Sequence, residues 1–200
     1  MLKPLEGSEL DRVKEFLLKC FDFDTVSQVL KEWVFARSGF GNAVLMIEEG
    51  LFKQIASAGV SSASLVAGRI AGWLVGREFI PSPWLFEVVY EVSNSVACCV
   101  DVVEQGVKAF LYGNDVLVAS VRRVYEPFCV GSYVAVRDAS DLAIIGVGRV
   151  AMDSRGIERA KSMGKLLEVA VLNVFDLGLL LRSERSLLWF QPAKLKPSHR

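Results

Sequence analysis

The sequence predicts an α+β protein, with an N-terminal antiparallel sheet and helices followed by a C-terminal β pseudo-barrel. Three observations support this. The chain has 200 residues, 52% of them hydrophobic, which is enough for two packed cores. Helix and strand patterns mix in the first half without a regular βαβ series. Short β-type runs separated by Gly, Asn, Asp and Pro fill residues 108–153. We therefore expect an α+β domain at 1–104, a barrel domain at 105–190 and a loosely held basic tail at 191–200.

The first half begins with a helix and a hairpin. Ser8 is a candidate N-cap for a helix over Glu9–Cys20, in which apolar residues recur at helical spacing. Two apolar runs, Gln28–Arg37 and Ala43–Ile47, flank the Gly-rich turn at 39–42 and predict a β-hairpin. The remaining expected elements are a helix at 49–57, two strands within 65–80 with a turn or bulge near Gly72, a helix at 84–92 opened by Ser82-Pro83, and a strand at 96–102.

The second half alternates short strands with turns. A helix at 107–112 ends at the turn cluster Gly113-Asn114-Asp115. The expected elements after it are strands at 116–118, 131–137, 142–152 and 166–174, a loop or helical turn at 155–165, a short helix at 176–182 and an edge strand at 186–191.

Three motifs in this half carry a family resemblance. They are FLYGNDVL at 110–117, Arg123 followed by GSYVAV at 131–136, and LAIIGVGR at 142–149. Together they resemble a PUA domain, a small pseudo-barrel that binds RNA in pseudouridine synthases and related proteins. The match is closer to the Nip-seven-like family of ribosome-biogenesis factors, and FLYGN is its most specific feature. Looser similarity extends back through Leu65–Tyr90 and forward to Arg182.

The resemblance implies a non-enzymatic RNA-binding factor of large ribosomal subunit biogenesis and pre-rRNA processing. Its relatives bind U-rich single strands and other ribosome-assembly proteins, and some contact the exosome. The implied location is the cytoplasm in an archaeon and the nucleolus or nucleus in a eukaryote. Two alternatives stay open: a protein-interaction adaptor in ribosome assembly, and an accessory part of an RNA-modifying enzyme.

Charge and aromatic residues indicate where RNA would bind. Residues 1–106 carry nine Lys+Arg against fourteen Asp+Glu, and residues 107–200 carry fourteen against nine, so the second half has a net charge of +5. A basic surface of this kind favours a polyanion. The candidate RNA-binding residues from charge are Arg155, Arg159, Lys161, Lys165, Arg149 and Arg123, with Arg122 beside them, and Tyr112, Tyr125 and Tyr133 offer stacking faces.

The resemblance adds a loop to this set. In PUA domains RNA lies near the Gly-containing loop after the first helix and near the last strand. The matching loop residues here are Gly113 and Asn114. The matching last strand at 166–175 is largely apolar, which shifts the expected RNA site toward 155–165 and leaves room for a protein partner.

Catalytic, cofactor and metal sites are not expected. The one histidine, His199, lies one residue from the end of the sequence, and none of the four cysteines forms a CxxC pair. No phosphate-binding GxxxxGK[ST] motif occurs. Gly146–Ala151 satisfies GxGxxA, but no helix pattern follows, so its glycines are interpreted as close-packed strand residues. Without an apolar signal core or a long apolar run, we expect a soluble, intracellular protein.

Overall fold

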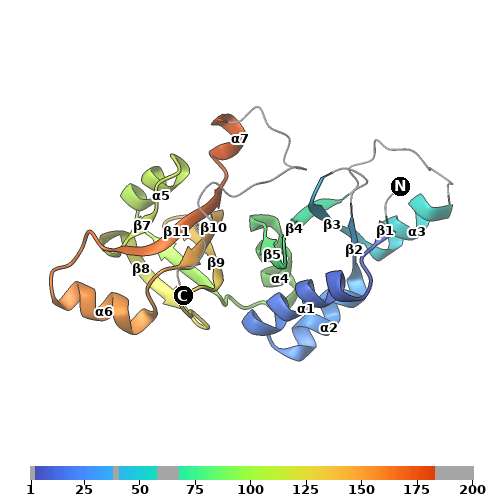
Figure 1. The fold of residues 1–200 in the computed structure, drawn as a ribbon, viewed down its shortest axis with the longest axis horizontal. Coiled ribbons are helices and arrows are strands. Elements are labelled where there is room, and N and C mark those ends of the chain that lie inside the picture. Colours follow the sequence, from blue (N-terminus) through green and yellow to red (C-terminus); the bar gives the residue numbers. More distant parts are fainter. Residues whose placement is uncertain (1–2, 38–40, 58–67, 183–200) are drawn as a thin grey trace. The chain divides into compact units, whose positions relative to one another are not determined.

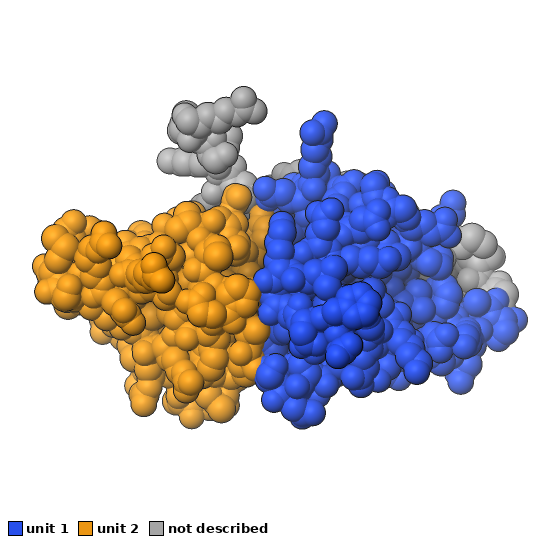
Figure 2. All heavy atoms as spheres, turned by 90° about the horizontal axis from the view of Figure 1, so that it is seen from below, with its two compact units in different colours: residues 1–95, 185–190 blue, residues 96–184, 191–200 orange. Residues whose placement is uncertain are grey.

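The computed structural model describes residues 3–37, 41–57 and 68–182. Within them the chain forms two compact units, residues 3–95 and 96–182 (Figures 1 and 2). The α+β class expected from the sequence is confirmed. The edge strand expected at 186–191 and the tail at 191–200 lie outside the described residues.

Unit 1 contains an antiparallel sheet whose strands are ordered as in the chain. These strands are β1 (Lys3–Pro4), β2 (Trp33–Arg37), β3 (Ala43–Glu48), β4 (Arg69–Val75) and β5 (Glu78–Pro81). The β2–β3 hairpin is confirmed, with Phe35 opposite Met46. Every residue of the central strand β3 except Glu48 is buried, as its unbroken apolar sequence predicts.

Four helices complete unit 1. They are α1 (Ser8–Cys20), α2 (Phe23–Glu32), α3 (Glu49–Ser57) and α4 (Pro83–Ser93). The Ser82 hydroxyl caps α4 by accepting a 3.2 Å hydrogen bond from the Leu85 amide, as expected for a Ser-Pro opening. The Phe16 ring of α1 lies 5.8 Å from the ring of Phe79 on β5 and 5.7 Å from that of Phe86 on α4, centroid to centroid. These aromatic contacts join the helices to the sheet in one core.

Two details of unit 1 differ from expectation, and a third agrees with it. Residues 28–32 end helix α2 and are not a strand, because Asp22 accepts the Thr25 amide at 2.8 Å and starts the helix upstream. The cap position of α1 is Gly7, with a φ of +52°, so Ser8 is already helical. The bulge expected near Gly72 is confirmed, because the pairing of β3 with β4 shifts register between Ile70 and Gly72, and the turn between β4 and β5 lies at Gly76.

Unit 2 is built on a curled, mixed six-stranded sheet. Its order is β7 (Val116–Leu117), β11 (Val169–Asp176), β10 (Ile144–Val150), β9 (Tyr133–Asp138), β6 (Cys99–Val102) and β8 (Val121–Tyr125). All pairs are antiparallel except β6 with β9. The helices are α5 (Glu104–Leu111), α6 (Ser154–Ser162) and α7 (Leu179–Arg182), and one 3-10 turn, η1, spans Val118–Ser120. Phe110 of α5 is fully buried.

Strand β6 explains where the two units divide. From the sequence, residues 96–102 are expected in the N-terminal domain, with the boundary at 104/105. In the structure β6 pairs with β8 and β9, so it belongs to the second sheet, and the units divide between residues 95 and 96. The residue pattern of a single strand does not indicate which distant strands it pairs with, so the boundary could not be placed from residues 96–102 alone.

Candidate nucleic-acid interface

Helix α6 carries the densest group of basic residues. Its N-cap is Asp153, whose carboxylate accepts the Gly156 amide at 2.7 Å. Ile157 and Ala160 are buried against the domain, and the helix is otherwise polar. The loop or helical turn expected at 155–165 is therefore wrong for residues 155–162, which belong to the regular helix Ser154–Ser162 capped by Asp153.

Two side-chain hydrogen bonds tie α6 to the edge strand β8. The Ser154 hydroxyl, at the start of α6, donates to a carboxylate oxygen of Glu126 at 2.7 Å, directly after the end of β8. The Lys161 ammonium, near the end of α6, donates to the backbone carbonyl of Val121 at 2.6 Å, where β8 begins. The helix therefore runs beside the strand in the opposite direction, and Figure 1 shows α6 next to β8.

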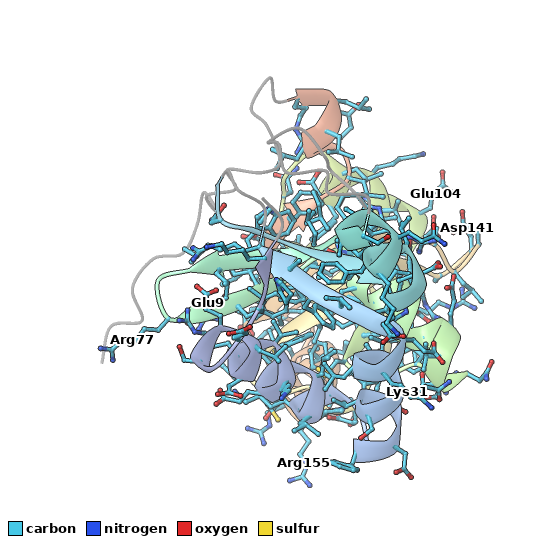
Figure 3. The ribbon with its side chains drawn as sticks, turned by 90° about the vertical axis from the view of Figure 1, so that its right-hand side faces the viewer. Glu9, Lys31, Arg77, Glu104, Asp141 and Arg155 are labelled. Carbon is cyan, nitrogen blue, oxygen red and sulfur yellow. The ribbon has the colours of Figure 1, made fainter. Side chains whose placement is uncertain are left out.

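This arrangement places basic residues from two sequence regions on neighbouring elements. Arg155 and Arg159 are exposed and lie one helical turn apart on α6, and Figure 3 shows Arg155 pointing outward. Arg122 and Arg123 are exposed on β8. Together with Lys161, these four arginines define what we call the α6–β8 surface. In the part of the chain that the structure describes, the guanidinium groups of Arg122, Arg155 and Arg159 have no hydrogen-bonded or ion-paired partner.

The two lysines of the predicted cluster are engaged within the protein. Lys161 is bound to the Val121 carbonyl, as described above. Lys165 forms an ion pair with Glu168 at 3.2 Å. Both side chains of that pair are half exposed, so solvent screens it and it is weak. The free positive charge of the α6–β8 surface therefore comes mainly from arginine.

Arg123 lies over the aromatic ring of Tyr125, and the hydroxyl of that ring is hydrogen-bonded to buried residues. Its guanidinium carbon lies 4.7 Å from the ring centroid of Tyr125. The Tyr125 hydroxyl donates to Asp101 at 3.0 Å and accepts from Arg137 at 2.8 Å. Asp101 and Arg137 are buried and form a two-bond ion pair at 2.7 and 3.1 Å. The hydrogen bond to Asp101 raises the pKa of Arg137 above its ordinary value, so this guanidinium stays charged.

Arg149 occupies a different environment from the four exposed arginines. It is half-buried on β10, and its Nε donates to the Gly131 carbonyl at 3.0 Å. Its guanidinium carbon lies 5.7 Å from the Tyr133 ring centroid, and Tyr133 is itself buried. These contacts make Arg149 a structural link between β10 and the loop before β9.

The Gly113-Asn114 loop lies apart from α6, farther along β11. The side-chain amide of Asn173 donates to the Phe110 carbonyl at 2.9 Å and to the Asn114 carbonyl at 3.2 Å. Strand β11 follows α6 in the chain and begins at Val169. Asn173 is four positions farther along this strand, which corresponds to a rise of about 13 Å. The eight predicted residues therefore fall into separate places: Arg123, Arg155, Arg159 and Lys161 lie on the neighbouring elements α6 and β8, whereas Gly113 and Asn114 lie farther along β11.

Three residues that support this loop were missed by the sequence analysis. Buried Asn173 and Asp176 bond to each other, and Arg182 of α7 pairs with Asp176 at 2.9 Å and also donates to the Leu111 carbonyl. The available signal was the presence of Asn and Asp in the otherwise apolar run of β11, because buried polar groups require partners.

The segment between α6 and β11 exposes apolar side chains. Met163 is 61% exposed, Leu166 44% and Leu167 81%. They follow the basic helix directly, so a charged surface and an apolar segment are neighbours in the chain.

The glycines of the GxGxxA motif lie within a strand. Gly146 and Gly148 are inside β10, between two antiparallel neighbours. A Cβ at Gly146 would lie 2.2 Å from the Phe175 carbonyl oxygen, and one at Gly148 would lie 2.2 Å from a Val171 methyl carbon. Their role is close strand packing, as interpreted from the sequence, and not a strand-to-helix phosphate turn.

Comparisons with known proteins identify the second unit. Residues 98–185 match the family described as the UPF0113 PUA domain. No curated protein matches the sequence of the chain. None of the helices in the described residues is long and apolar enough to cross a membrane.

Solved archaeal structures share the fold. A hypothetical protein of Pyrococcus horikoshii OT3 is 16% identical with a TM-score of 0.63, covering 88% of this chain and 94% of its own. A PUA-domain structure from Aeropyrum pernix K1, solved as a tartrate complex, is 16% identical with a TM-score of 0.59, covering 89% and 86%. A conserved PUA domain protein of Thermoplasma acidophilum is 16% identical with a TM-score of 0.54, covering 91% and 98%. At this identity the likeness shows the fold alone. With the family match at 98–185, the described part of unit 2 is similar to a PUA domain.

Proposed function

We propose that this chain, whose residues 98–185 match a PUA domain family, is a non-enzymatic factor that binds single-stranded RNA through the α6–β8 surface. The observation that carries the proposal is the pair of hydrogen bonds that fixes α6, with its exposed Arg155 and Arg159, beside β8, with its exposed Arg122 and Arg123. Arginine binds phosphate oxygens with two parallel hydrogen bonds and stacks on bases, which suits a flexible single strand.

The FLYGN motif at 110–114 extends the proposal to a biological setting. It resembles the Nip-seven-like ribosome-biogenesis factors, so we propose pre-rRNA as the RNA, with a preference for U-rich single strands. The setting is then assembly of the large ribosomal subunit, where other assembly proteins, and for some relatives the exosome, are the partners. Crosslinking in the source cells, followed by sequencing of the bound RNA, tests this setting. Reads spread over messenger RNA with no enrichment of pre-rRNA would contradict it.

A second candidate function is a protein-interaction adaptor in the same process. The observation in its favour is the exposed apolar segment Met163, Leu166 and Leu167. Apolar side chains next to a polar helix are typical of protein contact surfaces.

A titration separates these two functions. Fluorescence anisotropy with labelled U-rich single strands, mixed-sequence single strands and duplex RNA at low salt is expected to show saturable binding, tightest for the U-rich strand. Substituting Leu166 and Leu167 by Ser is expected to leave this binding unchanged. If no RNA of any kind binds at low salt, while the same Ser substitutions abolish recovery of assembly proteins, the adaptor function replaces the RNA-binding one.

A further inference from the structure

Arg123 and Tyr125 form a two-layer stack on the exposed edge of the PUA domain. They are two positions apart on β8, so their side chains extend from the same face of the strand. The guanidinium of Arg123 lies over the Tyr125 ring at 4.7 Å, and the Arg123 side chain is exposed. The guanidinium therefore lies over the ring on a side chain that is accessible to solvent.

The lower layer of this stack has a fixed orientation. The Tyr125 hydroxyl is bonded to both members of the buried Asp101–Arg137 pair, so the ring cannot turn away without breaking two hydrogen bonds. Arg137 also lies 5.0 Å from the ring centroid. Because the ring is fixed, the ordering of Arg123 above it requires little further loss of freedom when a ligand binds.

We propose that the Arg123–Tyr125 stack is a base-stacking subsite, in which an unpaired nucleobase of single-stranded RNA lies on the side of the Arg123 guanidinium away from the Tyr125 ring. The proposal rests on the RNA-binding function above and adds how a base is contacted. Arginine planes and aromatic rings are the groups on which proteins stack unpaired bases. A phosphate would instead bind the edge of the guanidinium and would not require the ring beneath it.

The position of the stack suits a strand that also contacts α6. Glu126, the residue after Tyr125, is the acceptor of the Ser154 hydroxyl at the start of α6. A base at Arg123 and phosphates at Arg155 and Arg159 would therefore lie on two elements that this hydrogen bond holds side by side. Since every base has a stacking face, this subsite is expected to accept all four bases and not to supply a preference for U.

Arg123→Lys tests the subsite because it retains the charge and removes the planar group. The expected result is a loss of RNA affinity of about fivefold or more, the lower end of what loss of one stacked base costs. The slope of log affinity against log salt stays the same, because the number of positive charges is unchanged. Arg122→Lys is the matched control. Arg122 is exposed on the same strand, at the irregularity between the Asp101 and Val102 pairings, and no aromatic ring of the described residues lies beneath it. Its variant is therefore expected to lose less affinity than Arg123→Lys and to respond to abasic positions in the RNA as wild type does.

Two further measurements complete the test. Tyr125→Leu removes the lower layer and is expected to reduce affinity as much as Arg123→Lys, and the double variant is expected to lose no more than either alone. In an RNA scanned with single abasic positions, one abasic site is expected to weaken binding by wild type but not by Arg123→Lys. Thermal unfolding of each variant checks that it is folded. If Tyr125→Leu does not fold, the comparison of Arg123→Lys with Arg122→Lys and the abasic scan still decide.

The outcomes distinguish the subsite from the function it rests on. If wild type binds no RNA, the proposed function fails. If wild type binds and Arg123→Lys behaves like Arg122→Lys, with the same abasic profile as wild type, RNA binding stands and the subsite is overturned. If Arg123→Lys and Arg122→Lys both reduce RNA affinity more than fivefold, both arginines bind phosphate through their planar groups, and the base-stacking subsite is overturned.

Discussion

The Lys161 ammonium donates a 2.6 Å hydrogen bond to the Val121 carbonyl, forty residues away in the sequence, and so fixes the end of α6 at the beginning of β8. The same lysine was selected from the sequence as an RNA contact. In the structure Lys161 has a different role, because its ammonium group is bound to the protein itself. This hydrogen bond holds α6, and with it Arg155 and Arg159, beside β8.

Lys161→Met is expected to loosen α6 while leaving the strands intact. Methionine keeps the apolar stem and loses the donor, so the Val121 carbonyl loses its side-chain partner. Hydrogen exchange of the α6 amides is expected to accelerate, and exchange in β9 and β10 to stay unchanged. Arg159→Met, which removes a charge from the same helix without breaking an anchor, is the control. Equal exchange in wild type and Lys161→Met would show that the hydrogen bond does not position the helix.

Arg137→Met is expected to destabilise the PUA domain strongly, by about 3–5 kcal/mol, because it leaves the Asp101 carboxylate buried without its partner. The double variant Asp101→Asn with Arg137→Met is expected to recover much of that loss, since no charge remains buried. Denaturant titration of both variants measures the difference. A double variant as unstable as the single one would mean that the pair contributes through packing rather than charge.

Asn173→Ala is expected to destabilise unit 2 by about 1–3 kcal/mol, because the substitution removes three hydrogen bonds that the Asn173 amide makes, to the Phe110 and Asn114 carbonyls and to Asp176. The Gly113–Asp115 loop is expected to exchange its amides faster, since Asn173 also binds the Asn114 carbonyl. Asn114→Ala is the control. Its amide makes one exposed hydrogen bond, to the Ala109 carbonyl, so a smaller loss is expected. A loss as large in the control would assign the effect to the loop itself and not to the buried amide.

Glu87 on α4 predicts a pH-dependent stability in unit 1. Burial raises the pKa of its carboxyl above the ordinary value of 4.5, Arg69 opposes this, and Glu91 adds to it. A folded-state pKa above the unfolded one means that the neutral carboxyl favours folding below the unfolded pKa, and that this contribution is lost as pH rises through the folded pKa. Glu87→Gln should therefore be more stable than wild type at pH 7 and no more stable at pH 4.

Tryptophan fluorescence during denaturation can follow this change, because Trp73 and Trp84 lie in unit 1. Glu91→Gln, at an exposed position of the same helix, is the control, with a smaller pH-dependent gain expected. A stability gain for Glu87→Gln that is equal at pH 4 and pH 7 would rule out the carboxyl charge as its source.

The sequence predicted elements whose signals are local. Ala43–Ile47 was placed to within one residue because it is an unbroken apolar run, and Ser82-Pro83 identified the start of α4 because capping depends on adjacent residues. Helix α2 was partly missed because its last turn leads directly into the β-formers of β2, which obscured the helical spacing of Val26 and Val29. Helix α6 was missed because its two buried residues are a small apolar signal.

The candidate site was predicted in composition but not in arrangement. Charge counting selected Arg155 and Arg159, and they are exposed as required. The Lys161–Val121 hydrogen bond places these two arginines beside the strand of Arg123. The Asn173–Phe110 hydrogen bond holds the loop of Gly113 against β11 instead. Such contacts join residues forty or more positions apart, and no local pattern encodes them.

The salt dependence of RNA binding tests the central claim most directly. Each phosphate contact to a single strand contributes about −0.7 to the slope of log affinity against log salt, so three free arginines predict a slope of about −2. Reversing two charges with Arg155→Glu and Arg159→Glu should weaken binding to every sequence and reduce the slope by about 1.4 in magnitude. The matched control is Lys19→Glu with Arg77→Glu, two exposed positions of unit 1, which should leave the slope unchanged. If the α6 reversal leaves both slope and affinity at wild-type values, the α6–β8 surface is not where RNA binds.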